Sequence, residues 1–232
     1  MAEVNRITRL GTVNAYLVRE EDGLTLIDTM LGGSAGKIIA AAEAAGAPIV
    51  RIVLTHAHSD HIGSLDALHA KVPDAEVVIS VREARLLAKD MSLDAGEADD
   101  KLRGGYPGAE TRPDRTVVAG DRIGSLEVVA APGHTPGQIA LLDTRDQTLY
   151  CGDAYSSLGG VATSAKVNPL CPIALFTWHR PVALASAQAV RALAPVRLAP
   201  GHGKVVASPL EAMDRAIDRA AGVPVHTPRG HS

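Results

Sequence analysis

Three histidines and one aspartate fall within six consecutive residues of this 232-residue chain, in the run His56-Ala57-His58-Ser59-Asp60-His61. The whole sequence contains only nine histidines, so random placement does not account for this cluster. In an extended segment His56 and His58 project to the same side, and a turn into a following helix would bring Asp60 and His61 toward them. Neutral imidazoles and carboxylates are ligands that suit zinc, and also manganese or iron. The run therefore predicts a metal site.

A hydrogen-bonded histidine cluster without a metal is the alternative. It is disfavoured because packed imidazoles repel one another when they are protonated. Three later segments place a histidine or aspartate between glycines or prolines, and they contain His134, Asp153 and His202. Glycine neighbours allow a sharp turn and leave room for a metal and its water. Each segment alone is a weak signal, since such dipeptides are common in turns. Their order after the histidine run makes them strong candidates.

The histidine run is expected on a loop between a strand and a helix, where side chains are held by a rigid scaffold but stay open to ligands. Apolar periodicity predicts strands at 14–18, 24–27, 49–54, 76–80, 116–118, 126–130, 139–142, 148–151 and 196–199. It predicts helices at 34–45, 62–71, 81–89, 181–193 and 209–221. The polar segment 90–113 is expected to be a lid or loop, and 222–232 a flexible tail.

A faint internal repeat connects these elements. A strand ending in aspartate, a crossover helix and a strand ending in histidine occur once with Asp28 and His56 and again with Asp153 and His202. Two such halves, packed sheet to sheet with helices outside, would bring four strand ends to one edge and form a shared site. Chance similarity between apolar strands is the other interpretation.

The composition narrows the class of protein. Apolar residues make up 46% and charged residues 21%, which is typical of a packed domain. The formal charge of -3 comes without a basic block, so we do not expect nucleic acid as a partner. Without a signal sequence or a long apolar run, we expect a cytoplasmic protein and no membrane partner. Cys151 and Cys171 are too few for a disulfide scaffold and are expected to be buried thiols.

These positions resemble the five-motif signature of metallo-β-lactamase-fold hydrolases, over roughly residues 10 to 205. The resemblance implies one α/β domain spanning 1–232, built as a four-layer αββα sandwich. It implies that one metal is held by His56, His58 and His134, and a second by Asp60, His61 and His202. It also implies that Asp153 bridges the two metals. Asp28 would orient a ligand imidazole without binding metal.

The function implied by this resemblance is hydrolysis of a lactone, ester or thioester by a metal-bound hydroxide. Two divalent ions, with zinc expected and manganese or iron also compatible, would activate a water, and Asp60 and Asp153 would take part in catalysis. A mononuclear-iron enzyme similar to persulfide dioxygenases is the alternative, although it would leave His61 and His202 without a role. β-Lactamase activity is expected only as a side reaction, because Asp153 is present and a periplasmic signal is absent.

The expected substrate is a small acyl compound. Glyoxalase II enzymes add a C-terminal glutathione-binding domain, and they tend to have a Cys-Gly-Arg run that this chain lacks after Asp153, so a glutathione conjugate is not expected. Some lactonases place a tyrosine after the bridging aspartate, and Tyr155 is therefore a candidate catalytic residue that holds the substrate carbonyl.

Aromatic residues in the irregular segments suggest either an apolar pocket over the metals or plugs that pack onto the core; they are Tyr106, Tyr155, Phe176 and Trp178. Trp178 is expected to contact the apolar part of the substrate. His179 and Arg180 could bind a carboxylate, although an arginine at a helix start is more often solvated. A homodimer is compatible with the sequence.

Overall fold

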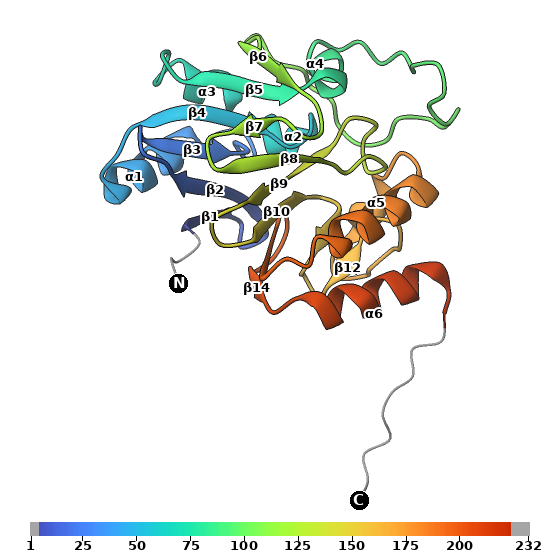
Figure 1. Ribbon diagram of the computed structural model, residues 1–232. Coiled ribbons are helices and arrows are strands. Elements are labelled where there is room, and N and C mark those ends of the chain that lie inside the picture. The colour runs from blue at the N-terminus through green and yellow to red at the C-terminus, as the bar shows by residue number, and fades with distance from the viewer. Residues whose placement is uncertain (1–4, 224–232) are drawn as a thin grey trace, which may run out of the picture.

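Two six-stranded sheets lie face to face in the computed structural model, which describes residues 5–223 (Figure 1). The first sheet has the order β1 (Asn5–Arg9), β2 (Val13–Arg19), β3 (Leu24–Ile27), β4 (Ile49–Leu54), β5 (Glu76–Ser80) and β6 (Arg115–Val117). The second has the order β14 (Val206–Ala207), β13 (Arg197–Pro200), β10 (Thr148–Gly152), β9 (Ile139–Asp143), β8 (Leu126–Ala130) and β7 (Arg122–Ile123). A separate hairpin pairs β11 (Tyr155–Ser156) with β12 (Ala162–Thr163).

Helices cover the outer face of each sheet. The first sheet carries α1 (Ala35–Ala45), α2 (Ser59–Ile62), α3 (Leu65–His69) and α4 (Val81–Leu87), and the second carries α5 (Arg180–Ala192) and α6 (Leu210–Ala221). A short 3-10 helix spans Pro172–Leu175. The buried side chains form three apolar clusters, one between the sheets and one under each helical layer. The predicted four-layer αββα architecture is confirmed.

Strand β4 shows how the sequence produces these layers. Ile52 and Leu54 belong to the cluster under the helices of the first sheet, whereas Val53 belongs to the cluster between the sheets. Alternate side chains of a strand point to opposite faces, so a strand with apolar residues in a row is buried on both sides. The continuous apolar run therefore follows from the position of β4 inside the four layers.

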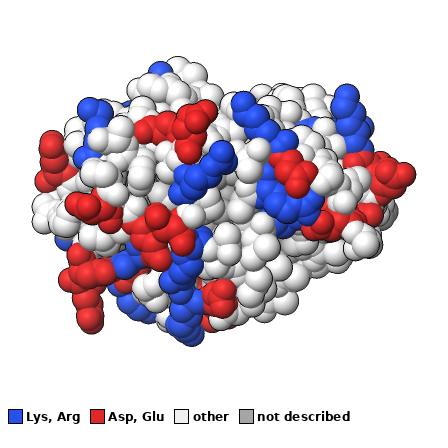
Figure 2. All heavy atoms as spheres, turned by 90° about the horizontal axis from the view of Figure 1, so that it is seen from above, with Lys and Arg blue, Asp and Glu red and all other residues white. Residues whose placement is uncertain are grey.

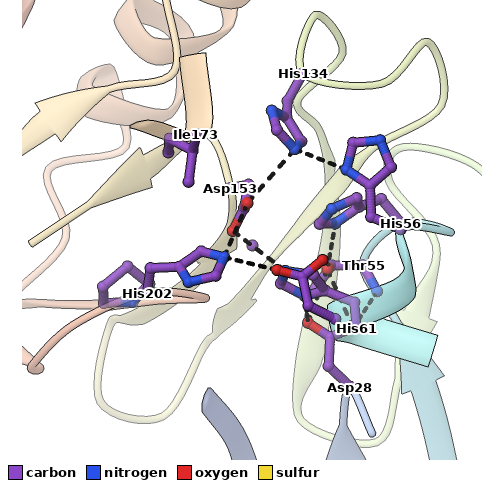
Figure 3. Close-up of polar contacts among 12 residues, drawn as sticks. Asp28, Thr55, His56, His61, His134, Asp153, Ile173 and His202 are labelled. Atoms are coloured by element: carbon purple, nitrogen blue, oxygen red, sulfur yellow. Dashed lines mark hydrogen bonds and ion pairs between the residues drawn. The ribbon is translucent and has the colours of Figure 1, made fainter. Parts of the chain in front are cut away.

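The predicted repeat is present in the topology. Strands β3 and β4 are parallel neighbours separated in sequence by α1, and β10 and β13 are parallel neighbours separated by a segment that contains α5. Asp28 and His56 follow the first pair, and Asp153 and His202 follow the second. The four strand ends meet at one edge of the sandwich (Figure 3).

The predicted helix 62–71 differs from the structure, which has α2 and α3 in its place and begins helical residues at Ser59. Gly63 separates them because the chain passes close to residue 32 here: a Cβ on Gly63 would lie 2.6 Å from the Gly32 nitrogen. Strand β1 and the two-residue strands were not predicted, since such short or half-exposed segments carry little periodicity.

The segment 90–113 contains no helix or strand, as predicted. Of the predicted tail, residues 224–232 lie outside the described residues.

Surface and thiol features agree with a packed domain. On the face seen from above, basic and acidic side chains are interspersed and form no continuous basic area (Figure 2). No helix within residues 5–223 has both the length and the apolar character needed to span a bilayer. Cys151 and Cys171 are unpaired and buried, as predicted.

Asn14 on β2 connects the two sheets at the edge where the strand ends meet. Its side-chain amide donates to the carbonyl oxygens of Pro200 and Gly203, at 2.8 and 2.7 Å, and its backbone amide donates to the carbonyl of Gly201 at 2.9 Å. The side chain is 1% exposed. These bonds hold the turn that carries His202 against the first sheet.

Replacing Asn14 with alanine should therefore destabilise the fold. Asn14→Ala removes two hydrogen bonds between the sheets, and only the Tyr16 hydroxyl and the Arg6 guanidinium still donate to the Pro200 and Gly203 carbonyls. We expect the free energy of unfolding to fall by about 1 to 3 kcal/mol in denaturant titration. Asn5→Ala, at an exposed position of β1, should change it by less than about 0.5 kcal/mol. Equal effects of the two variants would show that Asn14 does not hold the sheets together.

Candidate metal centre

All seven predicted ligand side chains converge at the edge shared by the two sheets (Figure 3). The first sheet and its helices contribute His56 and His58 after β4, and Asp60 and His61 on α2. The second sheet contributes side chains that follow β8, β10 and β13, namely His134, Asp153 and His202. Three sets of three have ligand atoms within 4.8 Å of one another: His56 with His58 and His134, His56 with His61 and Asp153, and Asp60 with His61 and His202.

Asp153 lies between two of these sets, the one of His56, His58 and His134 and the one of Asp60, His61 and His202; these are called the outer sets below. Its Oδ2 is 3.4 Å from His134 Nε2 and 3.3 Å from His202 Nε2, and its Oδ1 is 3.4 Å from His61 Nε2. His202 Nε2 is also 3.2 Å from Asp60 Oδ2. Ligand atoms about 2.0 to 2.1 Å from a tetrahedral ion lie about 3.4 Å from one another. The separations around Asp153 therefore match the edges of such coordination polyhedra.

Asp28 orients two of the histidines from behind. Its carboxylate accepts a hydrogen bond from His61 Nδ1 at 2.8 Å and from the Thr55 hydroxyl at 2.8 Å. Because that hydroxyl donates to Asp28, it can only accept from His56 Nδ1, which lies 3.1 Å away. Both rings thus carry their proton on Nδ1 and present an unprotonated Nε2 to the cluster. Asp28 adopts a positive φ of 61°, which aspartate tolerates better than most residues.

His58 and His134 are oriented by segments distant in sequence. His58 Nε2 donates to the carbonyl of Arg103 at 2.8 Å, and His134 Nδ1 lies 3.1 Å from the Thr177 hydroxyl, which itself donates to the Ser164 carbonyl. The remaining nitrogens, His58 Nδ1 and His134 Nε2, face each other at 3.0 Å. With both protons fixed elsewhere, two lone pairs meet there. A cation beside them would turn this repulsion into coordination.

Buried atoms without hydrogen-bond partners mark the same place. Among the ligand side chains they are the Nε2 atoms of His56, His61 and His202 and Oδ1 of Asp153. An unpaired buried polar atom is costly, and native structures pair nearly all of them. Four such atoms in one cluster, each able to donate an electron pair once the nitrogens are unprotonated, fit divalent metal ions. The residues present are therefore able to hold the metals that this donor set implies.

The pKa values of the histidines differ between the two ligand sets. Burial lowers the pKa of His56 and His58, and it lowers that of His134 to about 3, so these imidazoles stay neutral as ligands must be. Burial acts in the same direction on His202, but the charge of Asp153 outweighs it and raises the pKa to about 10. The carboxylates therefore concentrate negative charge on the half that contains His202, where a cation would replace the proton.

A cavity of about 420 Å³ opens over these ligand atoms. His58, Asp60, His134, Asp153 and His202 form its floor. One wall comes from Gly104 and Gly105; Gly104 has a φ of 94°, and a Cβ on it would lie 2.4 Å from His58 Nε2. The opposite wall is apolar and consists of Leu158, Leu170, Cys171, Pro172, Ile173 and Phe176. Figure 3 shows Ile173 pointing toward the cluster.

The structure does not support Tyr155 as a catalytic residue. Its side chain is fully buried in the cluster under α5 and α6, and its hydroxyl donates to the Ala187 carbonyl at 2.8 Å. Burial raises its pKa far above the usual range. The side chain belongs to the core cluster, its hydroxyl is already bonded to α5, and it does not line the cavity.

The expected role of Trp178 also needs correction. Its side chain is 5% exposed, and its Nε1 donates to the Asp100 carbonyl at 3.0 Å, which ties the 90–113 segment to the start of α5. The Arg180 guanidinium donates to the Ala174 carbonyl at 3.4 Å, and His179 caps α5. None of these three lines the cavity. Of the four aromatic residues, Phe176 lines it, and Tyr106 packs against the ring of His58.

The groups that orient the ligands from distant segments were not predicted from the sequence. Thr55 directly precedes the histidine run and could have been noticed from its position. Arg103 and Thr177 gave no signal, because a backbone carbonyl or a single hydroxyl acquires its role only through tertiary contact.

We expect Asp28→Ala to lower metal affinity by about tenfold to a hundredfold, because His61 and Thr55 lose the carboxylate that orients them. Competition with a chromogenic chelator measures this. Asp153→Ala should cause a larger loss, since Asp153 lies within reach of both metal positions. Equal losses would instead place Asp28 among the direct ligands.

Comparison with known proteins identifies the family. The sequence model of the metallo-beta-lactamase superfamily matches residues 8–202. The chain is 46% identical over 213 residues to "Uncharacterized protein YobT" of Bacillus subtilis (strain 168), covering 91% of each chain. It is 34% identical over 163 residues to a hydroxyacylglutathione hydrolase of Rhodospirillum rubrum, which covers 68% of this chain and 53% of that protein.

A solved structure described as TTHA1623 in a di-iron-bound form superposes with a TM-score of 0.65 at 27% identity, covering 91% of this chain and 97% of that one. The two-sheet architecture and the convergence of histidines and aspartates at one sheet edge agree with these matches. This chain belongs to the metallo-beta-lactamase superfamily.

Proposed function

We propose that this protein is a dinuclear metal-dependent hydrolase that cleaves a lactone, ester or thioester with a neutral, apolar acyl group. One observation carries the proposal: the cavity has metal-ligand atoms on its floor and an apolar wall facing them. Among the described residues that line it there is no lysine or arginine. A reactive floor beneath an apolar wall is suited to a substrate that joins a carbonyl to a hydrophobic group.

The ligand roles in this proposal follow the two outer sets. His56, His58 and His134 would hold one ion, and Asp60, His61 and His202 the other, with Asp153 shared. Two bound divalent ions supply an activated water near neutral pH and polarise the scissile carbonyl. Zinc is the metal we expect, and the same nitrogen and oxygen donors suit manganese and iron.

Asp60 is the candidate proton acceptor. Its side chain is 29% exposed, faces the cavity and lies 3.2 Å from His202 Nε2 through Oδ2. Burial alone would raise its pKa, but His61 and His202 outweigh that effect and hold it well below its usual range. Asp60 is therefore ionised at neutral pH in the metal-free site, and with the metals bound its carboxylate facing the cavity would accept a proton as the acyl bond is attacked.

The chemistry of the wall bears on substrate choice. A glutathione thioester carries two carboxylates, and the lining offers no basic side chain to pair with them. We therefore propose a small acyl compound and not a glutathione conjugate, although one relative has the name hydroxyacylglutathione hydrolase.

A mononuclear-iron oxygenase is less well supported, because His61 and His202 lie in a second complete set of ligand atoms. Metal analysis separates the two, since two ions per chain fit hydrolysis.

Turnover of a substrate panel tests the proposal. The metal-loaded protein should hydrolyse apolar lactones, esters or simple thioesters faster than S-acylglutathione or β-lactams, as followed by product release. Asp60→Asn should abolish turnover while circular dichroism and the melting curve show an intact fold. A strict preference for phosphodiesters, or full activity of Asp60→Asn, would refute the acyl hydrolase assignment.

Phe176→Ala tests the apolar wall. If the side chain covers about 60 Å² of the substrate at about 25 cal/mol per Å², its loss should raise KM for a long-chain or aromatic substrate by about tenfold. Short substrates should change little, because they do not reach it. Leu175→Ala is the matched control, since Leu175 is equally exposed but does not line the cavity. The same KM increase for short and long substrates would exclude a contact with the acyl group.

A further inference from the structure

Glu83 is a completely buried carboxylate that is not one of the metal-ligand side chains. It lies in the first turn of α4 and has no exposed surface. Its Oε2 accepts a hydrogen bond from the backbone amide of Ala57 at 2.8 Å, and its Oε1 accepts one from that of Gly137 at 2.9 Å. One side chain thus connects two loops that are 80 residues apart in sequence.

Those two loops carry the three histidines of one ligand set. Ala57 lies between His56 and His58, and Gly137 lies three residues after His134. Each hydrogen bond therefore acts on backbone adjacent to the ligands, and not on the ligands themselves. The other set, Asp60 with His61 and His202, receives no hydrogen bond from Glu83 among the described residues.

The start of α4 is itself fixed against the same loop. Ser80 accepts a hydrogen bond from the Glu83 backbone amide at 3.1 Å and donates one to the Gly137 carbonyl at 2.7 Å. The backbone of Glu83 therefore cannot shift without moving residue 137. A carboxylate on this anchored turn acts as a rigid spacer between the two loops.

The hydrogen-bond geometry requires an ionised carboxylate. Burial raises the pKa of Glu83, and the Thr135 hydroxyl together with the amides of Ala57 and Gly137 opposes that rise. Both carboxylate oxygens face N–H donors, so a protonated carboxyl would turn its own O–H toward one of them. An amide side chain at this position would have the same conflict, because only one of its two terminal atoms accepts hydrogen bonds.

We infer that Glu83 is a positioning residue that sets the separation of His58 and His134, and so the metal affinity of the His56, His58 and His134 set alone. This inference rests on the proposed function only in taking that set as a metal site. His58 Nδ1 and His134 Nε2 face each other at 3.0 Å, a distance that their lone pairs oppose before a cation binds. Glu83 holds the two loops together against this repulsion and preorganises the site.

The experiment isolates each ligand set and uses cobalt(II) alone as the probe. In a His202→Ala background the His56, His58 and His134 set is complete, and Glu83→Gln should weaken cobalt binding by about tenfold to a hundredfold in spectroscopic titration. In a His134→Ala background the Asp60 and His61 side of the site retains His202, and Glu83→Gln should leave cobalt affinity unchanged within error. The cobalt absorption spectrum should change only in the first background.

Asp66→Asn is the matched control. Asp66 is an exposed carboxylate that also accepts two backbone amide hydrogen bonds, from Glu110 and Thr111 at 3.1 and 2.8 Å, and it lies outside both ligand sets. It should not change cobalt affinity in either background. If Glu83→Gln does not fold, Glu83→Asp keeps the charge but is too short to reach both loops, and it should show the same selective loss.

Equal losses in both backgrounds would overturn the inference, because they would indicate general loosening of the fold. Unchanged affinity in the His202→Ala background would overturn it as well. Since cobalt binding is measured without substrate, a wild-type protein that binds two ions but hydrolyses no acyl compound would refute the proposed function and leave the role of Glu83 standing.

Discussion

The structure depends on holding metal-ligand groups from both sheets close together at one buried edge. Imidazole nitrogens and carboxylate oxygens lie 3.0 to 3.4 Å apart there, and at the His58–His134 contact two lone pairs oppose each other. No local segment could maintain such contacts alone, because each pair comes from strands far apart in sequence. The sandwich provides the restraint: two parallel strand pairs end at the same edge, and the Asn14 hydrogen bonds fix one sheet to the other there.

A second layer of contacts determines which nitrogen of each ring faces the cluster. Asp28 acts on His61 directly and on His56 through Thr55, whereas the Arg103 carbonyl fixes His58. Each contact holds a proton on the side away from the cluster, so the opposite nitrogen is available as a ligand. The positive φ of Asp28 belongs to this arrangement, because it aims the carboxylate at three donors at once.

Two irregular segments form the surroundings of the metal-ligand cluster. The 90–113 segment lies over His58 through Arg103 and Gly104 and is tied to α5 by Trp178. The segment that contains Leu170 and Phe176 forms the apolar wall. Because both segments lack long regular elements, their side chains can differ without disturbing the sheets. In the proposed function, the sheet edge would supply the reactivity and these two segments would determine the choice of substrate.

The sequence by itself determined the family, the layer architecture and the seven converging side chains. These could be predicted because strand periodicity and the types and order of metal-binding residues are local properties of the chain. The tertiary structure decided what each remaining side chain faces. Tyr155 and Trp178 are aromatic residues near the site in sequence. The hydroxyl of Tyr155, however, bonds to α5, and the indole of Trp178 bonds to the 90–113 segment. Glu83 resembled any helix-starting glutamate, and its place between Ala57 and Gly137 exists only once the sheets have packed. The direction of a side chain depends on contacts between segments distant in sequence, and local sequence patterns do not predict those contacts.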